Sequence, residues 1–214
     1  MRLDGGFTQN KVYQFGDKVE KYGETVGAEF YWYLSMPKQH IPANLNFSPG
    51  ELGMDFVESA GPIDLNAVFE IVEQYKSFEK LNNHEWPVYI DRIRFHVAQS
   101  PISNGEKLIK ELEKITLEPT FAHGDLSVNN IIQSKTGPKL IDPLYFNNFG
   151  SYLLDYAKLA FSLKFYNEDL AGFEKVKAQA NVPFFDVLVA SECVRVATYN
   201  RKFDFIAENL INEL

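Results

Sequence analysis

The feature of this sequence that most constrains its fold is a change in residue pattern near position 60. Before that point, short runs with strand character alternate with turn signals such as Gly16-Asp17 and Ser48-Pro49-Gly50. One helical pattern, residues 24–34, lies among them. The expected strands cover residues 11–15, 18–21, 44–47 and 52–58.

After residue 60 the apolar residues recur mainly at helical spacing. The clearest stretch is 64–81, where Asp64 is placed as an N-cap. Ser103 and Glu106 have the spacing of a capping box before a further helical segment. The expected helices cover residues 64–81, 88–98, the segment of Leu108 to Ile115, 152–165, 186–199 and 203–214.

One segment, residues 120–142, interrupts the helical part. Asn130-Ile-Ile132 and Lys139-Leu-Ile141 flank the turn Lys135-Thr-Gly137, which indicates a loop that leads into a short hairpin. The chain is therefore expected to be an α+β protein. We expect an N-terminal lobe of residues 1–60, with a hinge about residues 54–60, and a mainly helical C-terminal lobe of residues 61–214.

The composition excludes several classes of protein. Apolar residues make up 45% of the 214, which is enough to fill a core, and the formal net charge of −8 argues against a nucleic-acid scaffold. Cys193 is the only cysteine, so no intramolecular disulfide can form and a reducing compartment is expected. No signal peptide or membrane-spanning stretch is visible. The expected location is the cytoplasm, without a membrane partner.

The residues that carry chemistry gather around the predicted hairpin. His123, Asp125 and Asn130 form a His-x-Asp-x4-Asn pattern, which is expected by chance roughly 0.015 times in a chain of this composition. Asp142 ends the second strand of the hairpin, so its carboxylate is expected near the other two oxygen-bearing side chains. Hard oxygen ligands in a loose cluster suit Mg²⁺, which keeps several waters and shares phosphate oxygens with the protein. The alternative is that Asp125 and Asn130 are ordinary loop residues.

These motifs resemble those of the aminoglycoside phosphotransferase and choline kinase group, the small-molecule relatives of the protein kinases. The group's signature is His-Gly-Asp-x4-Asn, then Ile-Asp at a metal-binding strand end, then an Asp that opens a helix. Here it reads His123-Gly124-Asp125, Asn130, Ile141-Asp142 and Asp155. The resemblance implies a bilobal protein-kinase-like fold and a kinase that uses ATP and Mg²⁺. Asp142 is followed by Pro143 and not by the Phe-Gly of protein kinases.

The resemblance assigns roles to the catalytic lobe residue by residue. Asp125 would accept or orient the proton of a substrate hydroxyl in line with the γ-phosphate. Asn130 and Asp142 would hold Mg²⁺ between the phosphates. His123 would anchor the catalytic loop, and Asp155 would brace it by hydrogen bonds.

The N-terminal lobe has counterparts as well. The segment from Gly5, Gly6 and Phe7 to Asn10 resembles the hairpin that covers the phosphates, although two adjacent glycines are also typical of a flexible turn.

Val19-Glu20-Lys21 resembles the strand with the ATP lysine, and strand alternation favours Lys21 over Lys18. A solvated strand lysine is the alternative reading of Lys21. Glu29 is placed like the helical ion-pair partner of that lysine, with Glu24 as its competitor.

The run Leu52 to Glu58 resembles the interlobe hinge, where backbone groups of Asp55 and Val57 would meet adenine. A plain buried strand is compatible with the same role.

The acceptor is the part of the function that the sequence leaves open. The aromatic run from Tyr145 to Tyr152 could hold an ammonium group, and the acidic net charge would favour a cationic acceptor such as an amino alcohol or aminosugar. Core packing explains the same run, and a neutral sugar is equally compatible. The competing function is a pseudokinase that binds nucleotide without turnover. The joint presence of Asp125, Asn130 and Asp142 argues against that alternative.

Overall fold

The computed structural model describes residues 2–3, 10–144 and 149–214, and these form an α+β fold. An antiparallel sheet of five strands holds the N-terminal residues, in the order β1-β2-β3-β5-β4. A separate two-stranded sheet pairs β6 with β7. The strands are β1 (Arg2–Leu3), β2 (Lys11–Phe15), β3 (Lys18–Tyr22), β4 (Asn46–Ser48), β5 (Glu51–Asp55), β6 (Ile131–Ser134) and β7 (Gly137–Leu140).

Tight turns set the register of the large sheet. Gly16 has φ +60° at the β2–β3 turn, where Phe15 pairs with Lys18, and Gly50 has φ +84° at the β4–β5 turn, where Ser48 pairs with Glu51. Both values lie in the left-handed region that glycine adopts without steric cost. The predicted hairpin turns are thus confirmed, although β5 ends at Asp55 and not at Glu58.

The rest of the chain is mainly helical. Its α-helices, with α1 from the N-terminal part, are α1 (Val26–Ser35), α2 (Leu65–Gln74), α3 (Trp86–Gln99), α4 (Gly105–Glu113), α5 (Tyr152–Tyr166), α6 (Leu170–Ala180), α7 (Phe185–Ala197) and α8 (Asp204–Glu213). Short 3-10 helices cover Lys38–His40, Tyr75–Ser77, Val128–Asn130 and Arg201–Phe203. No helix in the described ranges has an apolar stretch long enough to cross a membrane.

The caps of these helices agree only in part with the sequence prediction. Asp64 caps α2, because its carboxylate accepts the backbone N–H groups of Asn66 and Ala67 at 3.0 and 3.4 Å. The predicted capping box at Ser103 is wrong. Ser103 donates its hydroxyl and backbone N–H to Glu208 of α8 instead, so the packing of the C-terminal helix takes the polar groups that a cap would use.

Among the α-helices in the described ranges, α6 is the one that the sequence pattern does not predict. Its buried face is narrow, formed mainly by Phe173, Val176 and Ala180, and Gly172 weakens the helical signal. The one local sign of its start is Asp169, whose carboxylate accepts the N–H of Gly172 at 2.8 Å.

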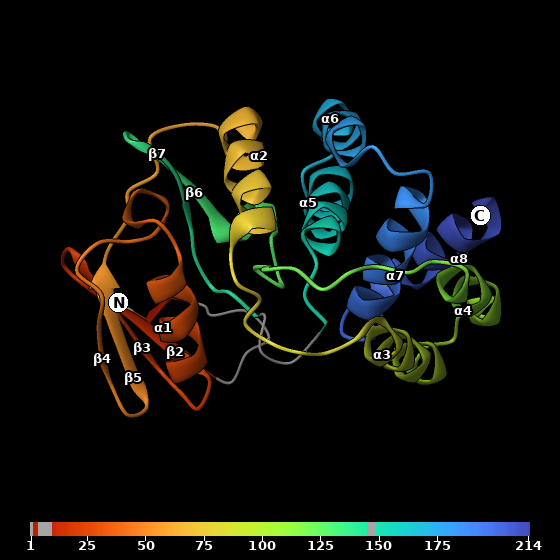
Figure 1. The fold of residues 1–214 in the computed structure, drawn as a ribbon, viewed down its shortest axis with the longest axis horizontal. Coiled ribbons are helices and arrows are strands. Elements are labelled where there is room, and N and C mark those ends of the chain that lie inside the picture. Colours follow the sequence, from red (N-terminus) through yellow and green to blue (C-terminus); the bar gives the residue numbers. More distant parts are fainter. Residues whose placement is uncertain (1, 4–9, 145–148) are drawn as a thin grey trace.

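The elements lie along the long axis of the molecule (Figure 1). The five-stranded sheet and α1 form one end, α2 and the β6–β7 hairpin lie in the middle, and α3, α4, α7 and α8 form the other end. Residues 56–64 contain no helix or strand and connect the sheet to α2. The lobe boundary near residue 60 stays a prediction.

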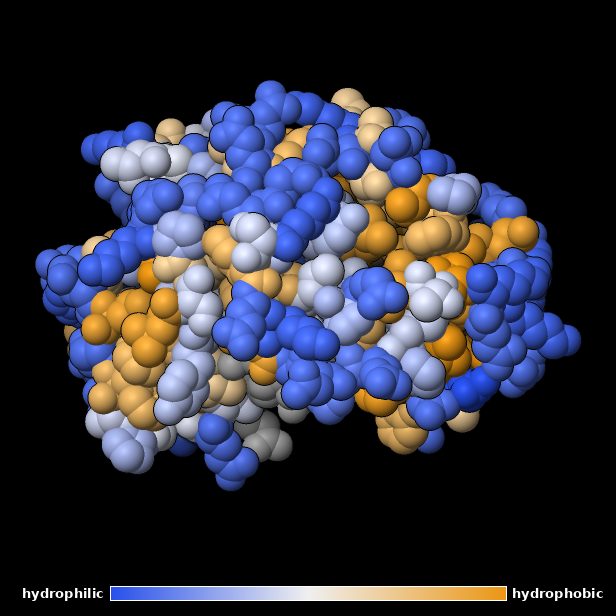
Figure 2. All heavy atoms as spheres, in the orientation of Figure 1, coloured by the Kyte–Doolittle hydropathy of each residue, from blue (hydrophilic) through white to orange (hydrophobic). Residues whose placement is uncertain are grey.

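Aromatic packing fixes α1 to the sheet. Figure 2 shows apolar residues gathered at the sheet end of the molecule, over β4 and α1. The ring of Phe47 on β4 stacks on Phe30 of α1, with centroids 5.0 Å apart. This contact packs α1 against the edge strand of the large sheet.

Trp32 of α1 connects the N-terminal part to the loop before β6. It is fully buried, its indole N–H donates to the carbonyl of Ala122 at 2.9 Å, and its ring stacks on Phe121. His123 packs edge-to-face against the same ring, with centroids 5.1 Å apart. A helix from the first 35 residues therefore fixes the position of the predicted catalytic loop.

Candidate active site

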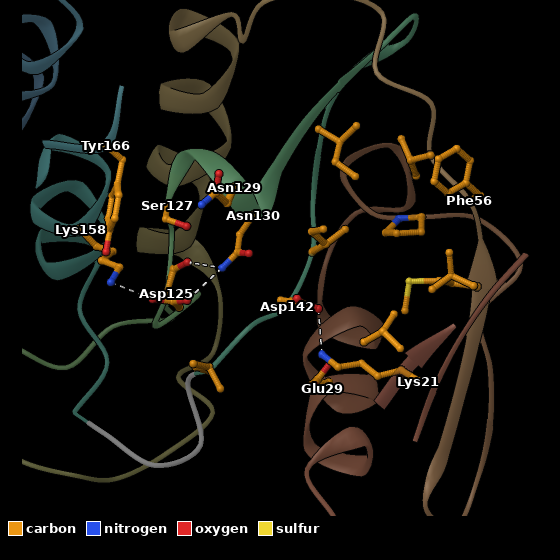
Figure 3. A pocket seen from close by; sticks show the side chains of 18 of the residues that line it. Lys21, Glu29, Phe56, Asp125, Ser127, Asn129, Asn130, Asp142, Lys158 and Tyr166 are labelled. Atoms are coloured by element: carbon orange, nitrogen blue, oxygen red, sulfur yellow. Dashed lines mark hydrogen bonds and ion pairs between the residues drawn. The ribbon is translucent and has the colours of Figure 1, made fainter. Parts of the chain in front are cut away.

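A pocket of about 740 Å³ lies between the large sheet and the helical part. Figure 3 shows its two polar sides: Lys21, Glu29 and Asp142 on one, and Asp125 and Asn130 with their neighbours on the other. Apolar residues from the sheet and the hairpin line the space near Lys21, namely Val12, Val19, Met54, Ile132 and Ile141. The pocket thus has a mainly apolar region and a strongly charged one.

Lys21 forms the centre of the sheet side. Its side chain is 3% exposed, and its Nζ donates to Glu29 Oε2 at 2.7 Å and to Asp142 Oδ1 at 2.8 Å. Burial disfavours the charged amine, but Asp142 and Glu29 outweigh this and raise the pKa of Lys21. Lys18 lies on the exposed side of the same strand and pairs with Asp55, as strand alternation predicts.

Glu29 is the partner of Lys21, and Glu24 is exposed ahead of α1. Asn10 is buried and donates its amide N–H to Glu29 Oε1 at 3.0 Å and to Thr25 Oγ1 at 2.6 Å. It does not line the pocket, so its position differs from the nucleotide contact that was expected. Asn10 instead holds the second oxygen of Glu29.

Asp142 lies two residues beyond the end of β7 and faces the pocket. Its backbone has φ +56°, a conformation that costs energy for any residue with a side chain. The hydroxyl of buried Tyr33 accepts its backbone N–H at 3.1 Å, and the N–H of Leu144 donates to the carbonyl of His123 at 2.8 Å. These bonds hold the strained turn that directs the carboxylate toward Lys21.

Asp125 and Asn130 form the other side. The amide N–H group of Asn130 donates to the backbone carbonyl of Asp125 at 2.8 Å and to its Oδ2 at 3.0 Å. The backbone between them is tightened by Ser127, whose N–H donates to Asp125 and whose carbonyl accepts the N–H of Asn130. Because its nitrogen is used in this way, Asn130 turns its amide oxygen away from Asp125 (Figure 3).

His123 connects the loop that carries Asp125 to the strand end that precedes Asp142. Its Nδ1 accepts the backbone N–H of Asp125 at 3.3 Å, so the ring proton lies on Nε2, which donates to the carbonyl of Ile141 at 2.8 Å. Burial is the main cause that lowers the pKa of His123 to about 4. The ring is therefore neutral near pH 7 and acts as an anchor.

Asp155, near the start of α5, braces the same loop. Its two oxygens accept the backbone N–H groups of His123 at 2.6 Å and of Gly124 at 2.8 Å. Burial raises the pKa of this carboxyl to about 7, although the two donors favour the ionised form. Asp155 does not line the pocket.

The structure adds two basic residues at Asp125 that the sequence analysis did not find. Lys158 of α5 places Nζ 3.2 Å from Asp125 Oδ1, and Arg195 of α7 places Nη2 3.4 Å from the same oxygen. Buried Glu192 accepts two bonds from Arg195, at 2.8 and 2.9 Å. A lysine within the otherwise apolar stretch of α5 was the only sequence signal for this cluster.

These cations change the chemistry of Asp125. Burial alone would raise the pKa of the carboxyl, but Lys158 and Arg195 outweigh it and lower the pKa to about 2. Arg92 of α3 also lines this end of the pocket, together with Tyr166 and Tyr199. The region around Asp125 is therefore rich in positive charge, in contrast to the whole chain.

The segment after β5 lines the apolar end of the pocket. The backbone N–H of Asp55 donates to the carbonyl of Ala43 at 2.9 Å, and that of Phe56 donates to Asp17 at 2.8 Å. The backbone of Val57 makes no hydrogen bond with any residue that the structure describes. Val57 thus has both backbone groups available at the pocket wall.

Two sets of predicted residues cannot be placed. Gly5, Gly6 and Phe7 lie outside the described residues, as do residues 145–148 of the aromatic run. Of the described aromatic residues in that run, Phe149 packs against Trp86, and Tyr152 lies under Lys76. Neither lines the pocket.

The residues that face the pocket fit a Mg²⁺ ion shared with phosphate groups. Asn130 offers its amide oxygen, and Asp142 offers the carboxylate oxygen that Lys21 does not contact. Within the described ranges, no three His, Cys, Asp or Glu side chains gather into a group that could hold a metal ion. Two hard oxygen donors suit Mg²⁺, which usually takes one or two protein ligands and completes its shell with water and phosphate.

The arrangement of these elements is the fold of the small-molecule kinases that are related to protein kinases, as the motifs predicted. By sequence, the chain matches none of the family models and none of the curated proteins with which it was compared.

Among solved structures, it is similar to the choline kinase LicA from Streptococcus pneumoniae, with a TM-score of 0.71 and 14% identity over 100% of this chain and 93% of that chain. A choline/ethanolamine kinase family protein from Mesorhizobium loti has a TM-score of 0.65 and 12% identity, over 100% and 86%. A thermostable mutant of the aminoglycoside phosphotransferase APH(4)-Ia, in a ternary complex with ADP and hygromycin B, has a TM-score of 0.63 and 13% identity, over 100% and 92%.

Proposed function

We propose that this protein is an ATP-dependent kinase that transfers the γ-phosphate to a hydroxyl group of a small molecule. The observation that carries the proposal is that Lys21, paired with both Glu29 and Asp142, faces Asp125 and Asn130 across one pocket. The similar structures support it, since LicA is recorded with AMP and APH(4)-Ia with ADP and hygromycin B. In both structures a nucleotide is bound to a protein whose fold is like this one.

The apolar end of the pocket is the proposed adenine site. Val19, Met54 and Ile141 line it and offer flat apolar contact to a base. Val57 would contact the base through its backbone N–H and carbonyl, and Asp55 through its carbonyl, because the N–H of Asp55 already bonds to Ala43. The phosphates would then extend toward Lys21.

The charged side is the proposed phosphate and metal site. Lys21 would contact the phosphates as a point charge, and Glu29, held by Asn10, would keep the amine in place. Asn130 and Asp142 would hold Mg²⁺, which supplies charge neutralisation between the phosphates. The bond from Lys21 to Asp142 would keep the carboxylate directed into the pocket before the nucleotide binds.

Asp125 is the proposed catalytic residue. With a pKa of about 2, its carboxylate is a weak base, so it would orient the acceptor hydroxyl and take the proton only late in the transfer. This suits phosphoryl transfer, in which bond breaking to the leaving group runs ahead of attack. Oδ2 receives the amide of Asn130 and Oδ1 receives the two cations, so the carboxylate is held rigidly for this role.

The proposal is tested by nucleotide binding and turnover measured together. Titration with Mg·ATP is expected to raise the Tm, and incubation with a panel of hydroxyl compounds is expected to give ADP together with a phosphorylated product. Asp125→Ala should abolish transfer and leave Mg·ATP binding nearly intact, whereas Asp142→Ala should weaken both. Stabilisation by Mg·ATP without turnover on any acceptor would favour a pseudokinase, and near-normal turnover by Asp125→Ala would reject the catalytic assignment.

A further inference from the structure

Three basic side chains from three helices line the end of the pocket beyond Asp125. Arg92 comes from α3, Lys158 from α5 and Arg195 from α7. Figure 3 shows Lys158 and Tyr166 on the far side of Asp125 from Lys21. An acceptor hydroxyl that reaches Asp125 from this side would bring the rest of the acceptor among these groups.

The negative groups at this end do not balance the positive ones. Among the groups that pair at this end, Asp125 and buried Glu192 face Arg92, Lys158 and Arg195, so two negative charges oppose three positive charges. Asp155 is also near Asp125 and Glu192, but its oxygens accept the N–H groups of His123 and Gly124 and it does not line the pocket. Neighbouring His96 adds no charge near pH 7, because burial together with Arg92 and Arg195 lowers its pKa to about 4.

Arg92 carries the unbalanced charge. Lys158 and Arg195 each contact Asp125 and Glu192, whereas Arg92 forms no hydrogen bond or ion pair with any residue that the structure describes. It is half-buried at the pocket wall, and burial followed by repulsion from Arg195 lowers its pKa. A guanidinium in this setting is stabilised by an oxyanion, which it binds with two parallel N–H groups.

We propose that the acceptor carries an anionic group, a phosphate monoester or a carboxylate, which Arg92 binds at the end of the pocket beyond Asp125. The inference rests on the proposed kinase function and specifies its substrate class. An ammonium group at the same place would meet three cations, so the local charge opposes the amine acceptor that the net charge of −8 suggests. The specificity is set by the charge of the pocket and not by that of the whole surface.

The experiment compares four related sugars: neutral glucose, cationic glucosamine, and the anionic compounds glucuronate and glucose 6-phosphate. A set of smaller compounds covers the same charges: glycerol, ethanolamine, glycerate and glycerol 3-phosphate. Binding of each is measured by calorimetry to the protein saturated with Mg·ADP, which fills the nucleotide site. Transfer from ATP is measured in parallel. At least one anionic member is expected to bind, and to be phosphorylated, at least tenfold better than its neutral and cationic counterparts.

Arg92→Gln is the informative variant. It is expected to reduce binding of the preferred anionic compound at least tenfold and to raise its KM, with little change in the KM for ATP. Arg92→Lys keeps the positive charge but lacks the two parallel N–H groups. Its affinity for the anionic compound should lie between those of the wild type and Arg92→Gln. Arg94→Gln is the matched control, because Arg94 lies on the same helix, pairs with Asp91 and Glu113 at the surface and does not line the pocket.

The outcomes separate this inference from the kinase proposal. A phosphate preference over carboxylate, or the reverse, identifies which oxyanion Arg92 binds. Absence of binding by every anionic compound, a preference for glucosamine or ethanolamine, or an anionic preference that Arg92→Gln leaves unchanged would overturn the inference while Mg·ATP binding and transfer to another acceptor stand. Failure of the kinase proposal shows itself differently, as the loss of Mg·ATP binding or of all transfer.

Discussion

The Nζ of Lys158 lies 3.2 Å from Oδ1 of Asp125, so a lysine of α5 contacts the carboxylate that we propose to be catalytic. The contact is largely buried, since the lysine side chain is 10% exposed. Glu192 lies on the other side of the amine at 4.0 Å and receives Arg195. The helical part thus sets the charge state and the orientation of Asp125.

Replacement of Lys158 by Met is expected to raise the pKa of Asp125, because one of the two cations that stabilise the carboxylate is lost. The proposed transfer uses ionised Asp125, so the acid limb of the pH profile of kcat/KM should move to higher pH. We also expect kcat to fall by about tenfold or more, as is typical for a group that orients an acid–base residue. Steady-state kinetics, extended below pH 5 as far as the fold is retained, measure both effects.

Lys164→Met is the control for this variant. Lys164 lies on the same helix but contacts the rings of Phe165 and Phe173, away from the pocket. It should leave the pH profile unchanged. An unshifted acid limb in Lys158→Met, at an unchanged Tm, would show that Lys158 has no influence on Asp125.

Replacement of Lys21 by Met is expected to remove Mg·ATP binding and to destabilise the fold. Glu29 is 1% exposed, so loss of its partner leaves a buried charge without a counterion, which typically costs about 3–5 kcal/mol. Glu29→Gln should be milder, because the amide can still contact Asn10 and Lys21 keeps Asp142. Calorimetric titration with Mg·ATP and denaturant unfolding check the two effects separately.

The matched control is Lys18→Met on the same strand. Lys18 pairs with Asp55 at the surface, and exposed ion pairs contribute little to stability. The expected result is an unchanged affinity for Mg·ATP. A Lys21→Met protein that is folded and binds Mg·ATP as tightly as the wild type would contradict the phosphate assignment.

The parts of the site that the sequence predicted are those set by local chain geometry. Asp125 and Asn130 lie on one short loop and bond to each other, and Asp142 follows the hairpin that this loop enters, so local chain geometry places all three at the same pocket. Strand alternation distinguished Lys21 from Lys18 for the same reason.

The parts that it missed depend on the packing of distant elements. Arg195 reaches Asp125 across 70 residues, through the packing of α7 against α5, and no local pattern encodes that contact. Asn10 is the converse case, a residue that the sequence assigns to the nucleotide site and the fold uses elsewhere. Its position in the sequence suggests a phosphate contact, but the fold directs its side chain to Glu29.

Replacement of Asp155 by Asn is expected to loosen the catalytic loop. The carboxylate accepts two backbone N–H groups with its two oxygens, and an amide offers one oxygen and one N–H group in the same space. The N–H of His123 or of Gly124 would then face a donor in a buried site, at a cost of about 1–3 kcal/mol. We expect kcat to fall with little change in the KM for ATP, because the loop positions Asp125 and not the nucleotide.

Asp169→Asn provides the comparison, because Asp169 accepts a single N–H as the N-cap of α6 and Asn caps helices equally well. Denaturant unfolding should show almost no loss of stability for that variant. Equal effects of the two substitutions would mean that the second acceptor oxygen of Asp155 is unimportant.

The imidazole of His123 is expected to stay neutral, with its proton on Nε2, from pH 8 down to about pH 5. Burial lowers its pKa to about 4 in the folded protein, whereas an exposed His in the unfolded chain titrates near pH 6.5. The unfolded chain therefore binds more protons in this window, and the stabilisation that is fully present above pH 6.5 is lost as the pH falls toward 4. At pH 5 the loss from this residue is about 2 kcal/mol relative to pH 7. NMR of the ring nitrogens measures the charge state directly, and a midpoint above pH 6 for His123 would show that its bonds to Asp125 and Ile141 do not hold the neutral form.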